Sequence, residues 1–218
     1  MRYWDEKLGI IPPGRFIPLL EQAKNIRYLD YHMFEAVCRQ LYKWMEEGRP
    51  LLPISVNFSR ITLLEEELIP TLERIHDRWP VPREYIELEI TESIGQMERD
   101  IVASISRDLQ SHGYGIALDD FGSSYTNMAM LSSVKFNTLK LDRSLVINLV
   151  QNKNSRIVAG CVLELCRQLK VASVAEGVET PQQLAVLKEL GCQQIQGFLY
   201  SVPVPVTEFE SRWLPRAR

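Results

Sequence analysis

The sequence predicts an α/β protein built on a parallel sheet, and two observations carry this prediction. Short apolar runs rich in β-branched residues alternate with longer segments whose apolar residues recur every three or four positions. This alternation is typical of strands joined by crossover helices. Because a closed eight-stranded barrel usually needs about 250 residues, the strand-and-helix units in 218 residues predict a TIM-type (β/α)₈ barrel that is truncated at its N-terminus.

Composition favours one domain over residues 1–218, with 45% apolar and 24% charged residues. The net charge of −3 is spread without a basic stripe, so DNA and RNA polymers are poor partners. No apolar run reaches the roughly 18 to 20 residues that span a bilayer, and no signal sequence opens the chain. We expect a cytoplasmic domain with four reduced core cysteines, in a parent protein that could itself be membrane-anchored.

Helical patterns come first along the chain. A short helix is expected from Phe16, and a longer one from Asp30, taken as its N-cap, to Gly48. Thr62 and Glu65 resemble a capping box, with Pro70 predicting a kink in the helix that follows. Near the C-terminus, Thr180 has the spacing of an N-cap whose helix begins with Pro181 and is followed by Gly191.

Six strands are predicted, each bounded by turn residues or helical patterns. They are Leu52–Asn57, Tyr85–Thr91, Ile116–Asp120, Thr138–Asp142, Val171–Glu176 and Cys192–Gln196. Side chains alternate between the faces of a strand, so Glu87 and Glu89, which alternate with aliphatic residues, are expected to point into the barrel. The same sorting places Lys140 on the inner face.

Polar residues gather at the C-terminal strand ends, where barrels of this kind place their active sites. They are Asn57, Glu89, Asp119, Asp120, Lys140, Glu176 and Gln196. Each one alone is explained as readily by a loop hydrogen bond or a solvated charge. Together they are not, because carboxylates at one rim repel one another by about 1 kcal/mol or more per close pair and a single lysine cannot balance four.

A divalent cation, or two, would balance this charge. The ligand set is all oxygen, which favours Mg²⁺ or Mn²⁺ over Zn²⁺. The adjacent Asp119 and Asp120 could serve two metals, an arrangement that activates water in phosphodiester hydrolysis, while Lys140 could orient the water or offset phosphate charge. These residues therefore predict a metal-dependent hydrolase or lyase and leave the substrate open.

Several motifs in one order carry a resemblance to a known family. They are Phe16–Pro18, Ser55–Asn57, Glu87–Ser93, Asp119–Gly122, Leu139–Ser144, Ala175–Glu179 and Gln196–Phe198. From Arg2 to about Pro205 the chain resembles the EAL domain, the cyclic di-GMP phosphodiesterase module of bacterial signalling proteins. The resemblance implies a modified (β/α)₈ barrel that opens cyclic di-GMP to linear pGpG with Mg²⁺ or Mn²⁺.

The resemblance also implies residue roles. Asn57, Glu89, Asp119 and Glu176 match first-metal ligands, and Asp120 matches the carboxylate of the second metal. Lys140 matches the residue that positions the water, and together with Asp120 and Glu176 it forms the expected catalytic set. Arg2 and Gln196 match contacts to the substrate or to the active-site water, and Glu92 and Glu179 match carboxylates that support the loop after Asp120.

Two departures from the family pattern stand out. The Glu-Ala-Leu signature, whose glutamate is a metal ligand, would lie immediately before Met1, so we expect a longer parent protein, with GGDEF or sensor domains among its partners. Ser124 stands where the family commonly has glycine, and serine has less backbone freedom. That loop is linked in the family to dimerisation, and a homodimer formed through the barrel is expected.

Three functions remain open on the sequence alone. The parent protein could hydrolyse cyclic di-GMP, or bind it as an inactive sensor, or serve as a dimerising scaffold. Retention of every catalytic position visible in the chain favours hydrolysis.

Overall fold

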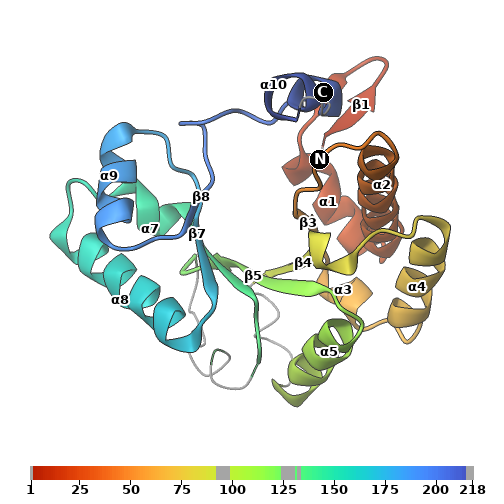
Figure 1. Ribbon diagram of the computed structural model, residues 1–218, viewed down its shortest axis with the longest axis horizontal. Coiled ribbons are helices and arrows are strands. Elements are labelled where there is room, and N and C mark those ends of the chain that lie inside the picture. Colours follow the sequence, from red (N-terminus) through yellow and green to blue (C-terminus); the bar gives the residue numbers. More distant parts are fainter. Residues whose placement is uncertain (1, 92–98, 124–130, 132–133, 215–218) are drawn as a thin grey trace.

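A parallel sheet of six strands forms the centre of the molecule (Figure 1). The computed structural model describes residues 2–91, 99–123, 131 and 134–214. The strands are β3 (Ile54–Asn57), β4 (Ile86–Thr91), β5 (Gly115–Phe121), β6 (Thr138–Leu141), β7 (Ala172–Ala175) and β8 (Gln194–Ile195), and their order in the sheet is their order in the chain. A separate antiparallel hairpin, β1 (Tyr3–Asp5) with β2 (Gly9–Ile11), precedes them.

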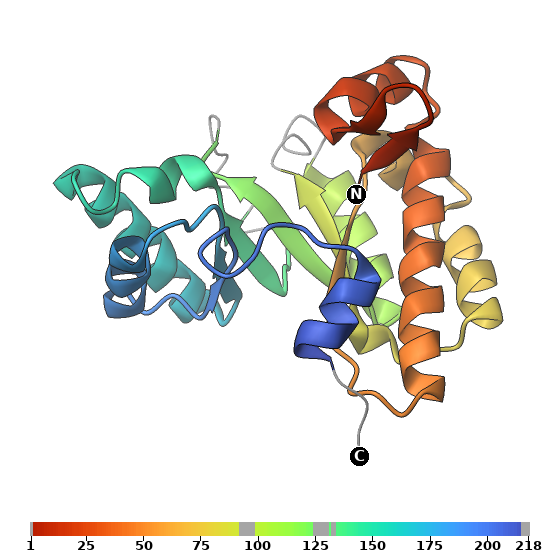
Figure 2. The ribbon, with the colours of Figure 1, turned by 90° about the horizontal axis from the view of Figure 1, so that it is seen from above.

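The described helices lie around the curved sheet. They are α1 (Pro13–Gln22), α2 (Ile26–Glu46), α3 (Arg60–Leu63), α4 (Leu68–Arg78), α5 (Arg99–Ser111), α7 (Arg143–Ile147), α8 (Lys153–Leu169), α9 (Pro181–Glu189) and α10 (Val206–Trp213), with a 3₁₀ turn at Arg83–Tyr85. Figures 1 and 2 show α2, α4 and α5 on the β3–β5 side and α7, α8 and α9 on the β6–β8 side. The segment after β8 returns across the open side of the sheet to α10, which lies against α2 (Figure 2).

The α/β class and the truncated barrel are confirmed, because all five strand pairings in this sheet are parallel. The inward face of β4 is also confirmed: Glu87 accepts hydrogen bonds from Thr138 (2.5 Å) and Ser55 (3.1 Å) on other strands. Five of the six strands are one or two residues shorter at an end than the predicted runs, and β5 is one residue longer at each end, since a strand ends where its ladder of backbone hydrogen bonds ends.

Three predicted helix signals were wrong. Helix α2 begins at Ile26, so Asp30 lies one turn inside it and is buried rather than capping it. Ser59, not Thr62, caps α3, accepting a hydrogen bond from the Thr62 N–H. Pro70 lies in the first turn of α4, where its missing N–H would have had no helical partner in any case, so it does not kink the helix.

The C-terminal capping box and most of the cysteine predictions are confirmed. The Thr180 hydroxyl accepts a hydrogen bond from the Gln183 N–H at the start of α9, and Gly191 has a positive φ just past the helix end. All four cysteines are free, and Cys38 and Cys166 are buried, but Cys161 is exposed on α8 and is not a core residue. None of the described helices is long and apolar enough to cross a membrane.

Candidate metal centre and active site

Lys140 is the centre of the charged cluster at the C-terminal strand ends. It projects from β6, is 5% exposed, and its Nζ lies 2.7 Å from Glu89, 3.2 Å from Asp119 and 2.6 Å from Glu176. These carboxylates come from β4, from β5 and from the residue after β7. The parallel order of the strands therefore brings residues far apart in the chain around one ammonium group.

A β-bulge shapes the end of β5. Leu118 pairs with Leu139, and Phe121 pairs with Leu141, so β5 carries one residue more than β6 across this interval. Asp120 has a left-handed backbone conformation, with φ of 57°, which is uncommon outside glycine, asparagine and aspartate. Strict alternation would send adjacent side chains to opposite faces, and a bulge redirects them.

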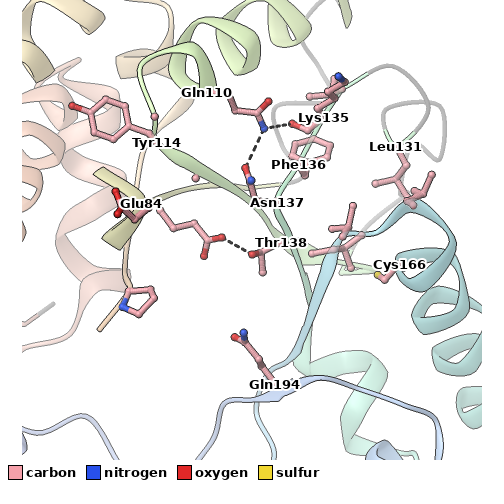
Figure 3. A pocket seen from close by; sticks show the side chains of 18 of the residues that line it. Glu84, Gln110, Tyr114, Leu131, Lys135, Phe136, Asn137, Thr138, Cys166 and Gln194 are labelled. Carbon is pink, nitrogen blue, oxygen red and sulfur yellow. Dashed lines mark hydrogen bonds between the residues drawn. The ribbon is translucent and has the colours of Figure 1, made fainter. Parts of the chain in front are cut away.

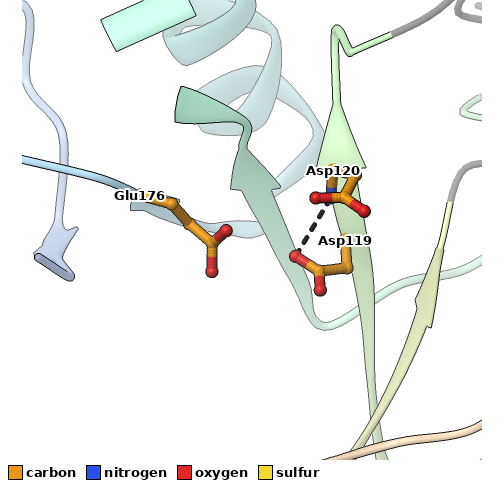
Figure 4. Close-up of side chains that lie close together, drawn as sticks. All are labelled: Asp119, Asp120 and Glu176. Atoms are coloured by element: carbon orange, nitrogen blue, oxygen red, sulfur yellow. Dashed lines mark hydrogen bonds between the residues drawn. The ribbon is translucent and has the colours of Figure 1, made fainter. Parts of the chain in front are cut away.

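Because of this local geometry, Asp119, Asp120 and Glu176 converge (Figure 4). One carboxylate oxygen from each residue lies within 4.8 Å of the others. Asp119 also accepts a hydrogen bond of 3.0 Å from the Asp120 N–H, which fixes its carboxylate. The donors are oxygen atoms alone and carry excess negative charge, so they fit a hard divalent cation.

Asn57 joins the cluster through Glu89. The two residues are register partners on β3 and β4, and Asn57 Nδ2 donates a hydrogen bond of 3.0 Å to Glu89 Oε2. Glu89 therefore bridges Asn57 and Lys140 with its two oxygens. In this arrangement the carbonyl oxygen of Asn57, unlike its amide nitrogen, remains able to serve as a ligand.

Burial and like charge act in the same direction on two of the carboxylates. Burial raises the pKa of Asp120, and the nearby charges of Asp119 and Asp142 raise it further. Burial also raises the pKa of Glu176, against the lowering effect of Lys140. For Lys140, burial opposes the charged form, but Glu89, Glu176 and Asp119 outweigh it and the pKa is raised. The lysine is therefore a permanent cation at neutral pH.

The remaining predicted residues lie around this cluster or outside it. Gln196 follows β8 and, with Glu176 and Arg143, lines an adjoining pocket of about 450 Å³. Glu179 pairs with Arg143 at 2.8 Å. The loop that Glu179 is predicted to support includes residues 124–130, which lie outside the described residues, as does Glu92, so the supporting role of both glutamates stays a prediction. Arg2 is exposed just before β1, and its role stays a prediction.

A larger cavity lies at the opposite ends of the strands. It has a volume of about 1050 Å³ and is lined by the first residues of several strands, among them Gly115, Thr138 and Gln194 (Figure 3). In barrels that end of the sheet serves stability, and catalysis is found at the C-terminal end. The charged cluster is therefore the candidate site, although its pocket is the smaller one.

Two residues near the site escaped the sequence reasoning. The sequence predicts Asp30 as a helix cap, although its place on the same stripe as Phe34, four residues later, is a signal for a position inside the helix. Arg143 borders the Glu176 pocket, and its side chain packs where a Cβ on Gly177 would lie. Arg143 is exposed, and an exposed arginine has no sequence pattern that distinguishes it from other surface arginines.

Comparisons with known proteins agree with this geometry. A family model described as the EAL domain matches residues 1–203. The chain is 31% identical over 208 residues to the bifunctional diguanylate cyclase/cyclic di-GMP phosphodiesterase MucR of Pseudomonas aeruginosa, covering 95% of this chain and 30% of that protein. It is 30% identical over 208 residues to the oxygen sensor protein DosP of Escherichia coli, covering 95% of this chain and 26% of that protein.

A solved structure described as the PaMucR phosphodiesterase in complex with c-di-GMP has a TM-score of 0.90 and 31% identity, covering 95% of this chain and 84% of that one. The chain thus spans about a quarter to a third of the length of these curated relatives. The family match extends over nearly the whole chain and includes every strand of the sheet that carries the charged cluster. On these grounds the chain belongs to the EAL domain family.

Proposed function

We propose that this chain is the catalytic domain of a longer protein that hydrolyses cyclic di-GMP to linear pGpG. The observation that carries the proposal is the convergence of Asp119, Asp120 and Glu176 at the C-terminal strand ends, in a chain whose fold closely matches a phosphodiesterase solved with c-di-GMP. The whole of residues 1–218 forms this one domain.

Mg²⁺ or Mn²⁺, held in a two-metal site by Asn57, Glu89, Asp119, Asp120 and Glu176, would polarise the phosphate and lower the pKa of a bound water. Lys140 carries a positive charge in all conditions of interest, so it cannot accept a proton from the attacking water. Its N–H groups instead orient that water and offset phosphate charge. With Lys140, the carboxylates of Asp120 and Glu176 form the proposed catalytic set.

Substrate contacts are assigned to the edges of the site. Gln196 lies on the wall of the pocket that also contains Glu176, within reach of a ligand that occupies it. Arg2 supplies a guanidinium for a substrate phosphate, which guanidinium groups bind well. Glu92 and Glu179 support the loop after Asp120.

The test is turnover by the full-length protein. Cyclic di-GMP is incubated with Mg²⁺ or Mn²⁺, and pGpG is separated by chromatography. We expect product from the wild type and from Glu189→Gln, which alters an exposed acid on α9, and none from Asp119→Asn. A folded protein that forms no pGpG with either metal would contradict the proposal.

One observation favours a second function, that of an inactive sensor. Lys140 already pairs with three carboxylates, so much of the cluster can persist without a metal. Calorimetry that shows tight cyclic di-GMP binding, together with no product over hours, would establish the sensor. If Asp119→Asn changed neither cyclic di-GMP binding nor turnover, the result would instead favour a dimerising scaffold.

Further expectations concern the parent protein. GGDEF or sensor domains are proposed as its other parts, in keeping with the names of the two relatives above. A homodimer through the barrel is proposed and is tested by sedimentation. Cytoplasmic placement of this domain is supported by its free cysteines.

A further inference from the structure

Asp30 is a buried carboxylate that contacts the turn leading out of β3, close in sequence to Asn57 of the candidate site. It lies on α2, is 6% exposed, and uses a single oxygen, Oδ2, for two hydrogen bonds. The Ser59 N–H donates to this oxygen at 2.9 Å and the Thr62 hydroxyl at 2.5 Å. Both donors belong to the segment that leaves β3 and enters α3.

That segment begins with Asn57, and three consecutive residues of it are held in place. Asn57 donates its side-chain N–H to Glu89 Oε2 (3.0 Å), Phe58 donates its backbone N–H to Glu89 O (2.9 Å), and Ser59 donates to Asp30. The Phe58 ring is 2% exposed and packs edge-on against Tyr31 and Phe34 of α2. Asp30 therefore holds the Ser59 end of the turn that begins at Asn57, and the conformation of this turn determines the direction of the Asn57 side chain.

Burying the Asp30 carboxylate costs free energy, so the packing of α2 on α3 does not by itself explain why this residue is an aspartate. Burial raises the pKa of Asp30, and the hydrogen bonds from Thr62 and Ser59 offset this only in part. A buried carboxylate without a cation is destabilising unless hydrogen bonds compensate it. Helix α2 could pack on α3 through apolar contacts at lower cost, whereas the backbone N–H of Ser59 needs an acceptor at one position.

We propose that Asp30 is a positioning residue for the metal centre: it fixes the β3–α3 turn and thereby holds the Asn57 side chain beside Glu89, so that the carbonyl oxygen of Asn57 can join the ligand set. The inference rests on the proposed function only for the presence of a divalent cation. Outer-sphere partners of metal ligands typically change metal affinity or activity by about 10- to 100-fold when removed.

The experiment measures Mn²⁺ binding to the full-length protein by calorimetry and counts only the binding that Asp119→Asn abolishes. We expect Asp30→Ala to weaken this binding by about 10-fold or more. Asp30→Asn keeps an oxygen that can accept from both Ser59 and Thr62, so it should restore binding to within about 3-fold of the wild type. This rescue would not follow from a need for negative charge at Asp30.

Arg27→Ala is the matched control. Arg27 pairs with Glu65 at 2.8 Å and so also ties α2 to the segment after α3, but at a point further along the chain from Asn57. We expect its Mn²⁺ affinity to equal that of the wild type. Cys38→Ala, which removes buried volume from the same helix, calibrates the effect of lost stability on the folded protein.

Each outcome decides the matter. If Asp30→Ala lowers the melting temperature but leaves Mn²⁺ affinity unchanged, or if Arg27→Ala and Cys38→Ala weaken binding equally, the positioning role is overturned. A wild type without Asp119-dependent Mn²⁺ binding overturns both the metal centre and this role. A wild type that binds Mn²⁺ but forms no pGpG overturns only the proposed hydrolysis, and the Asp30 comparison still stands.

Discussion

At the scale of single residues, the site is a balance between one ammonium group and several carboxylates. Lys140 neutralises part of the negative charge. Asp120 joins the cluster from a left-handed backbone conformation, and both burial and the neighbouring carboxylates raise the pKa of its side chain. Charge repulsion of this kind is tolerated in native proteins where function requires it. The metal-free protein should therefore gain stability when one of these charges is removed.

Asp120→Asn tests this balance. Asparagine tolerates the left-handed conformation, so we expect the metal-free melting temperature to rise by roughly 2–4 °C, the equivalent of about 1 kcal/mol in a chain of this size, while Mn²⁺ binding weakens. Because the pKa of Asp120 is raised in the folded state, its ionised carboxylate destabilises the wild type fully above that pKa. The destabilisation disappears below the ordinary pKa of a carboxyl group. The gain should therefore vanish in acid, which calorimetric scans across pH will show.

The control for this prediction is Asp108→Asn, an exposed acid on α5. It should change stability by no more than about 0.5 kcal/mol. A melting temperature of Asp120→Asn below that of the wild type at neutral pH would contradict the charge-balance account.

At the scale of elements, tight loops and one helix contact hold the strand ends in place. The loop after β7 carries Glu176, and the loop after β8 packs on it through hydrogen bonds from the Val178 N–H to Gln196 O (3.1 Å) and from the Leu199 N–H to Val178 O (3.0 Å). At the other end of this segment, α10 docks on α2 through Glu210, which accepts hydrogen bonds from Trp44 (2.8 Å) and Lys43 (3.1 Å).

Gly197→Ala should damage both the fold and the site. A Cβ at this position would lie 2.1 Å from Val178 O and 2.4 Å from Val178 N, and these are backbone atoms that cannot move aside. We expect a loss of about 3 kcal/mol, at the upper end for overpacking, measured by urea unfolding. Gly14→Ala in α1, with nothing within 4 Å of its Cβ, is the control and should retain full stability.

Glu210→Gln should loosen α10. The hydrogen bond from Trp44 contributes most to lowering the pKa of Glu210, against the effect of burial, and Lys43 adds to it. Hydrogen bonds to charged groups contribute about 1.5–3 kcal/mol, so we expect a loss of roughly 1–2 kcal/mol at neutral pH. Since the folded-state pKa is lowered, this contribution is full above the ordinary glutamate value and is lost as pH falls through the folded-state pKa.

Urea unfolding at several pH values measures this difference. Glu208→Gln, on the same helix but paired with Arg212 at the surface, should cost less than about 1 kcal/mol. Equal effects of the two variants would remove Glu210 from its assigned role in docking α10.

At the scale of the whole molecule, the curved sheet collects side chains from distant parts of the chain at one rim. The six strands follow one another in order in the sheet. The site residues therefore meet at the C-terminal strand ends only when every parallel pairing is in register. A cation bound there would link β3, β4, β5 and β7, and binding to the folded state alone stabilises that state by mass action.

Mn²⁺ or Mg²⁺ should therefore raise the melting temperature. At about 100 times the dissociation constant the expected gain is about 2.7 kcal/mol, and it should increase with pH because protons compete for the carboxylates. Scanning calorimetry with and without metal measures this gain, and Asp119→Asn should abolish it. If Ca²⁺ shifted the melting temperature as much as Mg²⁺ does, and Asp119→Asn showed the same shift as the wild type, the metal binding would be non-specific.

The sequence by itself determined the order of the strands, the inward face of Glu87 and Glu89, and the gathering of Asn57, Glu89, Asp119, Lys140 and Glu176 at one rim. These features follow from local periodicity and from the rule that parallel strands end together. Period-two alternation was enough for β4, where the ladder is regular.

Only the tertiary structure decided how the adjacent carboxylates of β5 share one site, because a bulge depends on pairing with β6 and not on local pattern. It likewise decided what Asp30 contacts: α2 begins at Ile26, so Asp30 lies inside the helix and accepts a hydrogen bond from the Ser59 N–H. The acceptor for the Ser59 N–H lies 29 residues earlier in the chain. No local sequence spacing encodes a contact over that distance. For this reason the candidate ligands could be predicted from the sequence, and the contacts of Asp30, the proposed positioning residue, could not.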